Sequence, residues 1–284
     1  MRKILCPTDF SRTATKAVEY AAFIAQRAHA HLSLLHVVHL PIVDTSETAL
    51  IAGELLGEQM RDAGEKLNAL KRHMEEKYGA NRNESFTCDY ILKEALLTDI
   101  AEHLTTDEAY DLVVMGTTGG GNTLEELLIG SNAEAVIEHV KCPVLTIPST
   151  ANWPNIHKIL FASDYTDNDL EALQQVAHLA RIVGATVEVV HVTKEATIEN
   201  TAKAEAYRLK LQQTFPEAGL QFQEVVNKHP DEGIKAYYDA TGADMAAVLR
   251  KEKGFFRELF STSLAEKMTY QASVPLLVLH ARKQ

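Results

Sequence analysis

The sequence is poor in several features that define large classes of proteins. It has three cysteines and one tryptophan among 284 residues. Three widely spaced cysteines provide no disulfide framework, which favours a reducing compartment. Apolar runs nowhere reach the roughly 18 residues that cross a bilayer, and the apolar stretch near the start is too short for a signal peptide. We therefore expect a cytoplasmic protein that does not enter a membrane.

Basic residues are also in deficit. Lysine and arginine number 28 against 39 aspartates and glutamates, which gives a net charge of −11. The electrostatic field of a protein with this net negative charge repels nucleic-acid backbones and anionic lipid, so we expect neither as a partner. Hydrophobic residues make up 46% and charged residues 24% of the chain, as in ordinary globular proteins. The length suits two domains better than one.

The chain contains two copies of one domain. Residues 3–37 align without a gap with residues 158–192, and ten of these 35 pairs are identical. The shift of 155 residues falls to 132 where Val144 matches Leu276, so the second copy carries a deletion. Prolines and turn formers in residues 148–155 mark the linker. We predict one domain over residues 1–149 and a second over residues 156–284.

Each copy alternates short β-branched runs with longer helical patterns. In the first copy, helices are expected after Ser11, along a long segment around residues 56–74, and over residues 95–104 and 133–140. Strands are expected over residues 3–8, 31–39, 86–92, 112–116 and 144–147. In the second copy the long helix shrinks to about residues 196–215. This alternation predicts an α/β fold with five parallel strands per domain and helices on both faces.

A glycine-rich loop follows the fourth predicted strand. Glycines at positions 116, 119, 120 and 121 would let backbone N–H groups approach an anion at the edge where α/β sheets bind ligands. A flexible loop without a ligand is the alternative. Asn122 stands where the lysine of a phosphate-binding P-loop belongs, and Leu124 replaces the third glycine of the dinucleotide fingerprint. Both of those motifs are excluded.

Three segments together resemble the universal stress protein family. They are Pro7–Ser11 after the first strand, Leu35–Val37 in the second, and the loop Gly116–Ser131. The resemblance covers both copies and implies two tandem Rossmann-like domains of the adenine nucleotide alpha hydrolase-like type. ATP-binding members space their glycines as Gly, two residues, Gly, nine residues, Gly-Ser. Ten residues separate Gly119 from Gly130 here and nine separate Gly120 from it, so both glycines remain candidates for the phosphate contact.

The resemblance implies that ATP, arriving with magnesium, binds the first copy. Asp9 and the Val37 backbone would hold adenine, and Pro7 and Gly116 would line the ribose. The phosphates would lie among Met115, the loop glycines and the start of the next helix. The complete implied set is Pro7, Thr8, Asp9, Val37, Met115, Gly116, Gly119, Gly120, Gly130, Ser131 and Asn132. No residue pattern assigns a catalytic or metal-ligating role.

The second copy serves as an internal control. Leu249, Glu252 and Thr262 replace the three key glycines, so this copy should not bind ATP in the same manner. A basic stretch over residues 250–257 fits a solvated surface better than an anion site.

Two candidate site residues, Ser131 and Asp9, and one recurring histidine have structural interpretations. Ser131 and Glu134 have the spacing of a helix capping box, which residues 263–266 repeat in the second copy. Asp9 recurs as Asp164 and His36 as His191, so a structural role explains both copies.

We therefore predict a regulatory, ATP-binding stress-response protein without efficient catalysis. A slow ATP hydrolase and an interaction module that binds no nucleotide are the alternatives. The apolar edge strands over residues 144–147 and 276–279 are expected to pair within the chain, as an intramolecular domain pair, or across a homodimer.

Overall fold

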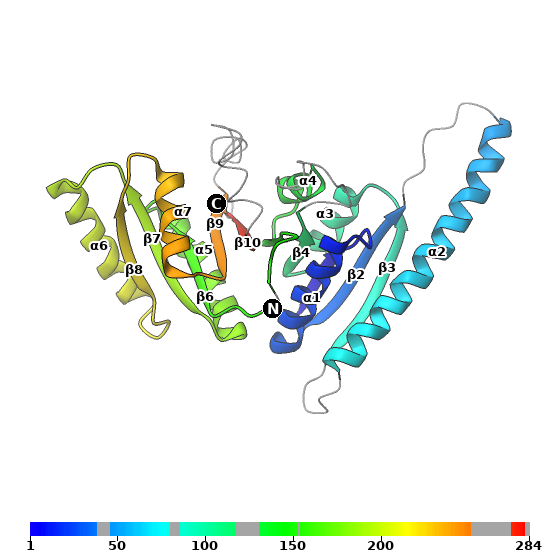
Figure 1. Cartoon of the computed structure of the whole chain (residues 1–284), viewed down its shortest axis with the longest axis horizontal. Coiled ribbons are helices and arrows are strands. Elements are labelled where there is room, and N and C mark those ends of the chain that lie inside the picture. Colours follow the sequence, from blue (N-terminus) through cyan, green and yellow to red (C-terminus); the bar gives the residue numbers. More distant parts are fainter. Residues whose placement is uncertain (39–45, 80–85, 118–130, 153, 251–273, 282–284) are drawn as a thin grey trace. The chain divides into compact units, whose positions relative to one another are not determined.

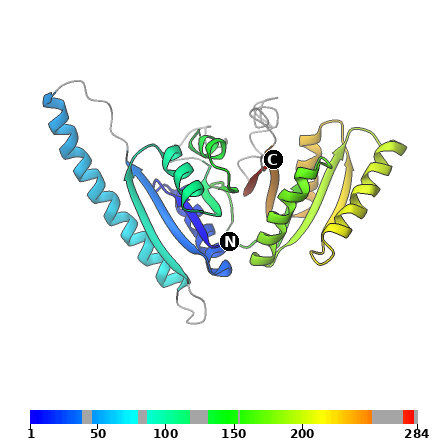
Figure 2. The ribbon, with the colours of Figure 1, turned by 180° about the vertical axis from the view of Figure 1, so that it is seen from behind.

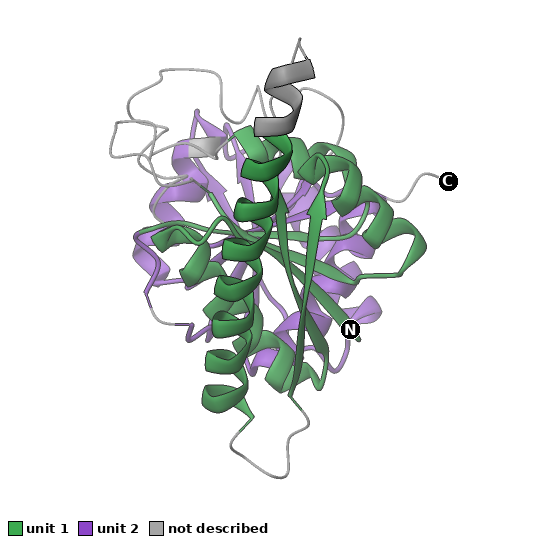
Figure 3. Ribbon diagram, turned by 90° about the vertical axis from the view of Figure 1, so that its right-hand side faces the viewer, with its two compact units in different colours: residues 1–149 green, residues 150–284 purple. Residues whose placement is uncertain are grey.

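The computed structural model describes residues 1–38, 46–79, 86–117, 131–152, 154–250 and 274–281. The chain divides into two compact units, Met1–Ser149 and Thr150–Gln284 (Figure 3). Each unit is an α/β domain whose described strand pairs are all parallel, as the alternation in the sequence predicts.

Unit 1 has five strands in the order β3-β2-β1-β4-β5. The strands are β1 (Lys3–Pro7), β2 (His31–Val38), β3 (Thr87–Glu94), β4 (Leu112–Gly116) and β5 (Val144–Ile147). The helices are α1 (Arg12–Ala28), α2 (Ser46–Tyr78), α3 (Leu97–Asp107) and α4 (Ser131–His139). Figures 1 and 2 show α1 and α2 on one face of this sheet and α3 and α4 on the other.

Unit 2 repeats this arrangement with the strand order β10-β9-β6-β7-β8. Its strands are β6 (Lys158–Ala162), β7 (Thr186–Thr193), β8 (Gln221–Val226), β9 (Met245–Arg250) and β10 (Leu276–His280). Its described helices are α5 (Asp167–Val183), α6 (Ile198–Thr214) and α7 (Pro230–Thr241). The shortening of α2 to α6 accounts for much of the deletion that the sequence shows.

The start, the buried face and the end of helix α1 can each be explained by residues in its own sequence. The Ser11 hydroxyl caps its start by accepting a hydrogen bond from the Ala14 amide at 3.1 Å. Small residues at helical spacing, among them Ala14, Ala17 and Ala21, are at most 5% exposed and pack against the sheet. The helix ends at His29 in the left-handed conformation, with φ of 50°.

The strand order fixes where a ligand site can form. The chain leaves β1 toward β2 on one side, and β4 lies on the other side of β1. Right-handed crossovers in opposite directions place helices on opposite faces. The chain therefore leaves the carboxyl ends of β1 and β4 toward opposite faces of the sheet. The space between these two connections is the topological switch point, where open α/β sheets bind ligands.

The sheet registers align the two units residue by residue. Ile4 pairs with Leu112 in unit 1, and the corresponding Ile159 pairs with Met245 in unit 2. Position 116, at the end of β4, therefore corresponds to position 249, at the end of β9. The sequence comparison of Gly116 with Leu249 has the same register, and the other two pairs lie outside the described residues.

All three cysteines are free, and burial raises the pKa of each thiol. The pKa values of Cys88 and Cys142 rise to about 12. Thiols with such pKa values are poor nucleophiles at neutral pH, so these cysteines act as small apolar residues.

Candidate functional site

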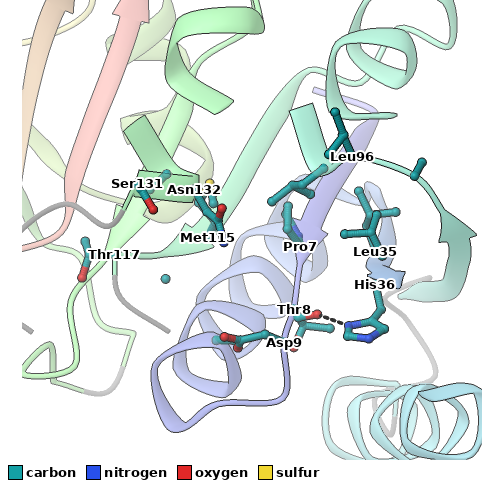
Figure 4. Close-up of a pocket in the computed structure, with 16 residues that line it drawn as sticks. Pro7, Thr8, Asp9, Leu35, His36, Leu96, Met115, Thr117, Ser131 and Asn132 are labelled. Carbon is teal, nitrogen blue, oxygen red and sulfur yellow. Dashed lines mark hydrogen bonds between the residues drawn. The ribbon is translucent and has the colours of Figure 1, made fainter. Parts of the chain in front are cut away.

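A pocket of about 410 Å³ lies at the carboxyl end of the unit 1 sheet (Figure 4). It is bounded by the ends of β1, β2 and β4, by the segment that enters α3, and by the starts of α1 and α4. The lining residues are Pro7, Thr8, Asp9, Ala14, Leu35, His36, Val37, Ala95, Leu96, Leu97, Met115, Gly116, Thr117, Ser131, Asn132 and Ala133.

Eight predicted site residues meet in this one pocket, although they come from four separate stretches of the chain. They are Pro7, Thr8, Asp9, Val37, Met115, Gly116, Ser131 and Asn132. Gly119, Gly120 and Gly130 lie outside the described residues.

The apolar side of the pocket is not among the site residues predicted from the sequence. Ala95, Leu96 and Leu97 follow β3 and line the pocket, and Leu96 is 52% exposed. The signal was available, because the residues after each parallel strand meet at one edge of the sheet. An apolar cluster directly after the third strand therefore belonged among the candidates.

The loop after β1 is held in a strained conformation by its own polar groups. Phe10 has a φ of 63°, an unusual value for a residue with a bulky side chain. Its amide donates to the Thr8 hydroxyl oxygen at 3.1 Å, and the Ser11 amide donates to the Asp9 carboxylate at 2.9 Å. The Thr8 amide donates to the Leu35 carbonyl at 2.8 Å, which ties the loop to β2.

His36 fixes this loop from the side of β2. Its Nδ1 lies 2.7 Å from the Thr8 carbonyl oxygen, as the dashed line in Figure 4 marks. Because a carbonyl only accepts, Nδ1 carries the proton and donates. Unit 2 repeats the contact, with His191 Nδ1 2.7 Å from the Ser163 carbonyl oxygen. The structural interpretation of this histidine pair therefore agrees with the geometry.

The backbone of Val37 faces the pocket. Along a strand, successive residues turn their N–H and C=O groups to alternate neighbours. The Leu35 carbonyl accepts from Thr8, so it points toward β1. The groups of Val37 point to the same side, beyond the last residue of β1 at Pro7. They are thus placed to bond a flat polar ring.

Gly116 is required by close packing. A Cβ atom built on it would lie 2.9 Å from Cγ2 and 3.1 Å from the carbonyl carbon of Thr13, and 3.2 Å from the Ala14 nitrogen. Backbone atoms cannot yield as the end of a side chain can. The end of β4 and the first turn of α1 therefore approach each other only because this residue is glycine.

The described residues do not show the capping contact that we expect of Ser131. Ser131 is the first described residue of helix α4, and the residue before it lies outside the described part of the chain. Within the described part of the chain, its hydroxyl accepts no bond from the Glu134 amide, and its side chain is exposed. Ser131 and Asn132 instead line the pocket at a helix N-terminus, where the helix dipole favours negative charge.

The pocket carries few charged groups. Asp9 and His36 are the titratable residues among its described lining. The described residues contain no group of three side chains suited to hold a metal ion.

Fold and pocket together define a tandem α/β protein with a ligand-type site at the switch point of its first unit. The chain belongs to the universal stress protein family, whose model matches residues 1–148 and again residues 155–280. Each match spans nearly a whole unit, so the tandem organisation is part of this assignment.

Two relatives and one solved structure illustrate the similarity. The universal stress protein MJ0531 of Methanocaldococcus jannaschii is 32% identical over 147 residues, which is 51% of this chain and 81% of the relative. Slr1230 of Synechocystis is 23% identical over 295 residues, covering 98% of this chain and 99% of the relative. A universal stress protein from Archaeoglobus fulgidus has the same fold, with a TM-score of 0.70 at 18% identity and coverage of 99% and 98% of the two chains.

None of the helices, as far as the structure describes them, is long and apolar enough to span a membrane.

Proposed function

We propose that this chain is a cytoplasmic, nucleotide-binding stress-response protein that holds one ATP in unit 1. The observation that carries the proposal is the single pocket that collects eight predicted site residues from four stretches of chain. Side chains scattered by chance over a sheet would not converge at its switch point.

The lining suits the parts of an adenine nucleotide. Leu35 and Leu96 lie on one side of the pocket and offer apolar surface to a base (Figure 4). The Val37 backbone offers a donor and an acceptor for its polar edge. Ser131 and Asn132 lie at the other side, where the N-terminus of α4 provides amide donors for phosphate oxygens. Magnesium would be held chiefly by the phosphates.

The same lining argues against efficient catalysis. The described lining includes neither lysine nor arginine, the groups that neutralise charge during phosphoryl transfer. His36 has its Nδ1 committed to Thr8, and the Asp9 carboxylate accepts from Ser11. Binding, rather than turnover, would then carry the regulatory function.

Two measurements test this proposal. Mass spectrometry of freshly purified, denatured protein should release an adenine nucleotide, and the protein stripped of it should rebind ATP. Release of phosphate from ATP should stay well below about 1 per second, the low end of ordinary enzyme turnover. Sustained turnover at or above that rate would show that the protein is an enzyme. Absence of binding at millimolar ATP would favour the alternative of an interaction module that binds no nucleotide.

A further inference from the structure

The two units differ at a position that no motif marks. Residue 14, on the first turn of α1, is alanine, and its counterpart on α5 is Asp169. Ala14 lines the pocket of unit 1. Asp169 is only 1% exposed, which is unusual for a carboxylate and requires an explanation from its partners.

Asp169 receives three hydrogen bonds from the loop after β6. Its Oδ2 accepts from the Asp164 amide at 2.8 Å, the Thr166 amide at 3.1 Å and the Ser163 hydroxyl at 2.9 Å. All three groups act as donors, which suits an ionised carboxylate. The carboxylate thus lies against the inner side of the loop that corresponds to the Thr8–Ser11 loop of unit 1.

A tyrosine and a strained aromatic residue complete this arrangement. Because the single proton of the Ser163 hydroxyl goes to Asp169, the Tyr207 hydroxyl, 2.9 Å away, donates to Ser163. The Tyr165 amide also donates to the Ser163 oxygen, and Tyr165 has a φ of 66°. This repeats the bond from Phe10 to Thr8, so the two loops have the same geometry.

The corresponding donors in unit 1 have no such acceptor. Among the residues that the structure describes, neither the Asp9 amide nor the hydroxyl proton of Thr8 has an acceptor. Both residues line the pocket. Two donors that a carboxylate satisfies in unit 2 are therefore open toward the ligand space in unit 1.

We propose that the Asp169 carboxylate occupies in unit 2 the place that a hydrogen-bond acceptor atom of the ligand takes in unit 1. The residue at position 14, or at its counterpart 169, then decides whether a unit can bind a ligand. Unit 2 is then closed by the side chain of Asp169, and Leu249, which is 3% exposed, adds a side chain where unit 1 has Gly116. The statement about nucleotides rests on the proposed function. The statement that the Thr8–Ser11 loop accepts a carboxylate does not.

The sharpest test transfers the difference into unit 1. In Ala14→Asp, the introduced carboxylate should take the two open donors and lower ATP affinity by roughly 10- to 100-fold, the range of a lost hydrogen bond to a charged group. Thr15→Asp is the matched control, because it adds the same charge to an exposed neighbour on the same helix turn. Its affinity should stay within about twofold, since exposed charges are screened.

A second readout needs no nucleotide. In hydrogen exchange of the unliganded chain, Ala14→Asp should slow exchange of the Asp9 amide at least ~10-fold, because that amide gains an acceptor. Asp169→Ala should speed exchange of the Asp164 amide. Unit 2 already holds aspartates at positions 164 and 169, so we expect Ala14→Asp to fold and to melt no lower than the parent.

The outcomes are separable. If the parent binds no ATP, the proposed function fails, while amide exchange still decides whether the loop accepts the carboxylate. Unchanged exchange of the Asp9 amide in Ala14→Asp would overturn the inference, as would a loss of the fold in that variant. Unchanged ATP affinity in a folded Ala14→Asp variant of a parent that binds ATP would overturn it as well.

Discussion

At the scale of single residues, the packing at Gly116 is the feature that most directly requires the absence of a side chain. The contact at 2.9 Å to Thr13 and the two backbone contacts near it leave no room for a methyl group. The floor of the pocket is therefore set by the packing of β4 against α1, and a larger residue there changes both the fold and the site.

We predict that Gly116→Ala lowers the free energy of unfolding by about 1–3 kcal/mol, the usual cost of overpacking, and weakens ATP binding. Gly57→Ala is the control, because Gly57 lies within α2 and an added Cβ would meet nothing within 4 Å. That variant should gain about 0.5–1 kcal/mol from helix propensity. Chemical denaturation of both variants measures the difference, and equal stabilities would refute the close-packing argument.

Tyr207 provides a test of the closed loop in unit 2. Burial raises its pKa to about 12 in the fold, whereas an exposed tyrosine titrates near 10. The protonated form is thus favoured by folding, so its stabilisation is complete below pH ~10 and is lost as the pH rises toward the folded value.

Tyr207→Phe should therefore cost about 1 kcal/mol at neutral pH, the value of the bond to Ser163. The difference from the parent should shrink above pH ~10, where the parent begins to lose its own contribution. Tyr90→Phe, at a residue that is 39% exposed, is the control. Unfolding free energies measured from pH 7 to 11 decide the matter. A difference that stays constant over that range would contradict the assignment.

At the scale of secondary-structure elements, the two helix starts that border the pocket differ in kind. Helix α1 has a capping serine before its first residue, with the hydroxyl of Ser11 bonded to the Ala14 amide. The first described residue of helix α4 is Ser131, whose side chain is exposed in the pocket lining.

We predict that Ser11→Ala lowers the free energy of unfolding by about 1 kcal/mol, as the loss of a cap does. Ser131→Ala should change stability by less than about 0.5 kcal/mol, as exposed substitutions usually do, and should weaken ATP binding. Thermal unfolding and ATP titration of the pair separate the two roles. A cost for Ser131→Ala equal to that of Ser11→Ala would support the capping interpretation.

The elements that the sequence predicts most accurately are the buried ones. Strands over residues 112–116 and 144–147 match β4 and β5 to the residue, because fully buried parallel strands are continuous apolar runs. The third strand extends to Glu94, two residues beyond the prediction. It lies at the edge of the sheet, where exposed polar residues such as Lys93 pair without an apolar signal.

The site residues that could be predicted from the sequence are those that belong to local patterns, and the residue that could not depends on tertiary contacts. The motif after β1 and the glycine at the end of β4 could be found from the sequence because each is a local pattern. The role of residue 14 could not, because it depends on where the Asp169 carboxylate lies relative to a loop several residues earlier.

At the scale of the whole molecule, the duplicated units have kept their fold while their interiors diverged. Unit 1 buries a neutral pair, with the Tyr110 hydroxyl donating to Ser33 at 2.7 Å. The counterpart of Ser33 is Glu188, which accepts from the Tyr237 hydroxyl and lies 3.7 Å from the Lys158 ammonium. Divergence of buried polar groups on one scaffold fits two units with different duties. Pairing of the two edge strands, β5 and β10, stays a prediction.

The central claim is that one unit of the two binds a nucleotide, and calorimetric titration of the nucleotide-free, full-length chain with ATP and magnesium tests it most directly. Unit 1 has an open pocket with unused donors, and unit 2 places Asp169 and Leu249 at the corresponding positions. The account predicts one ATP per chain. Two equivalent sites per chain, or no binding at all, would contradict it.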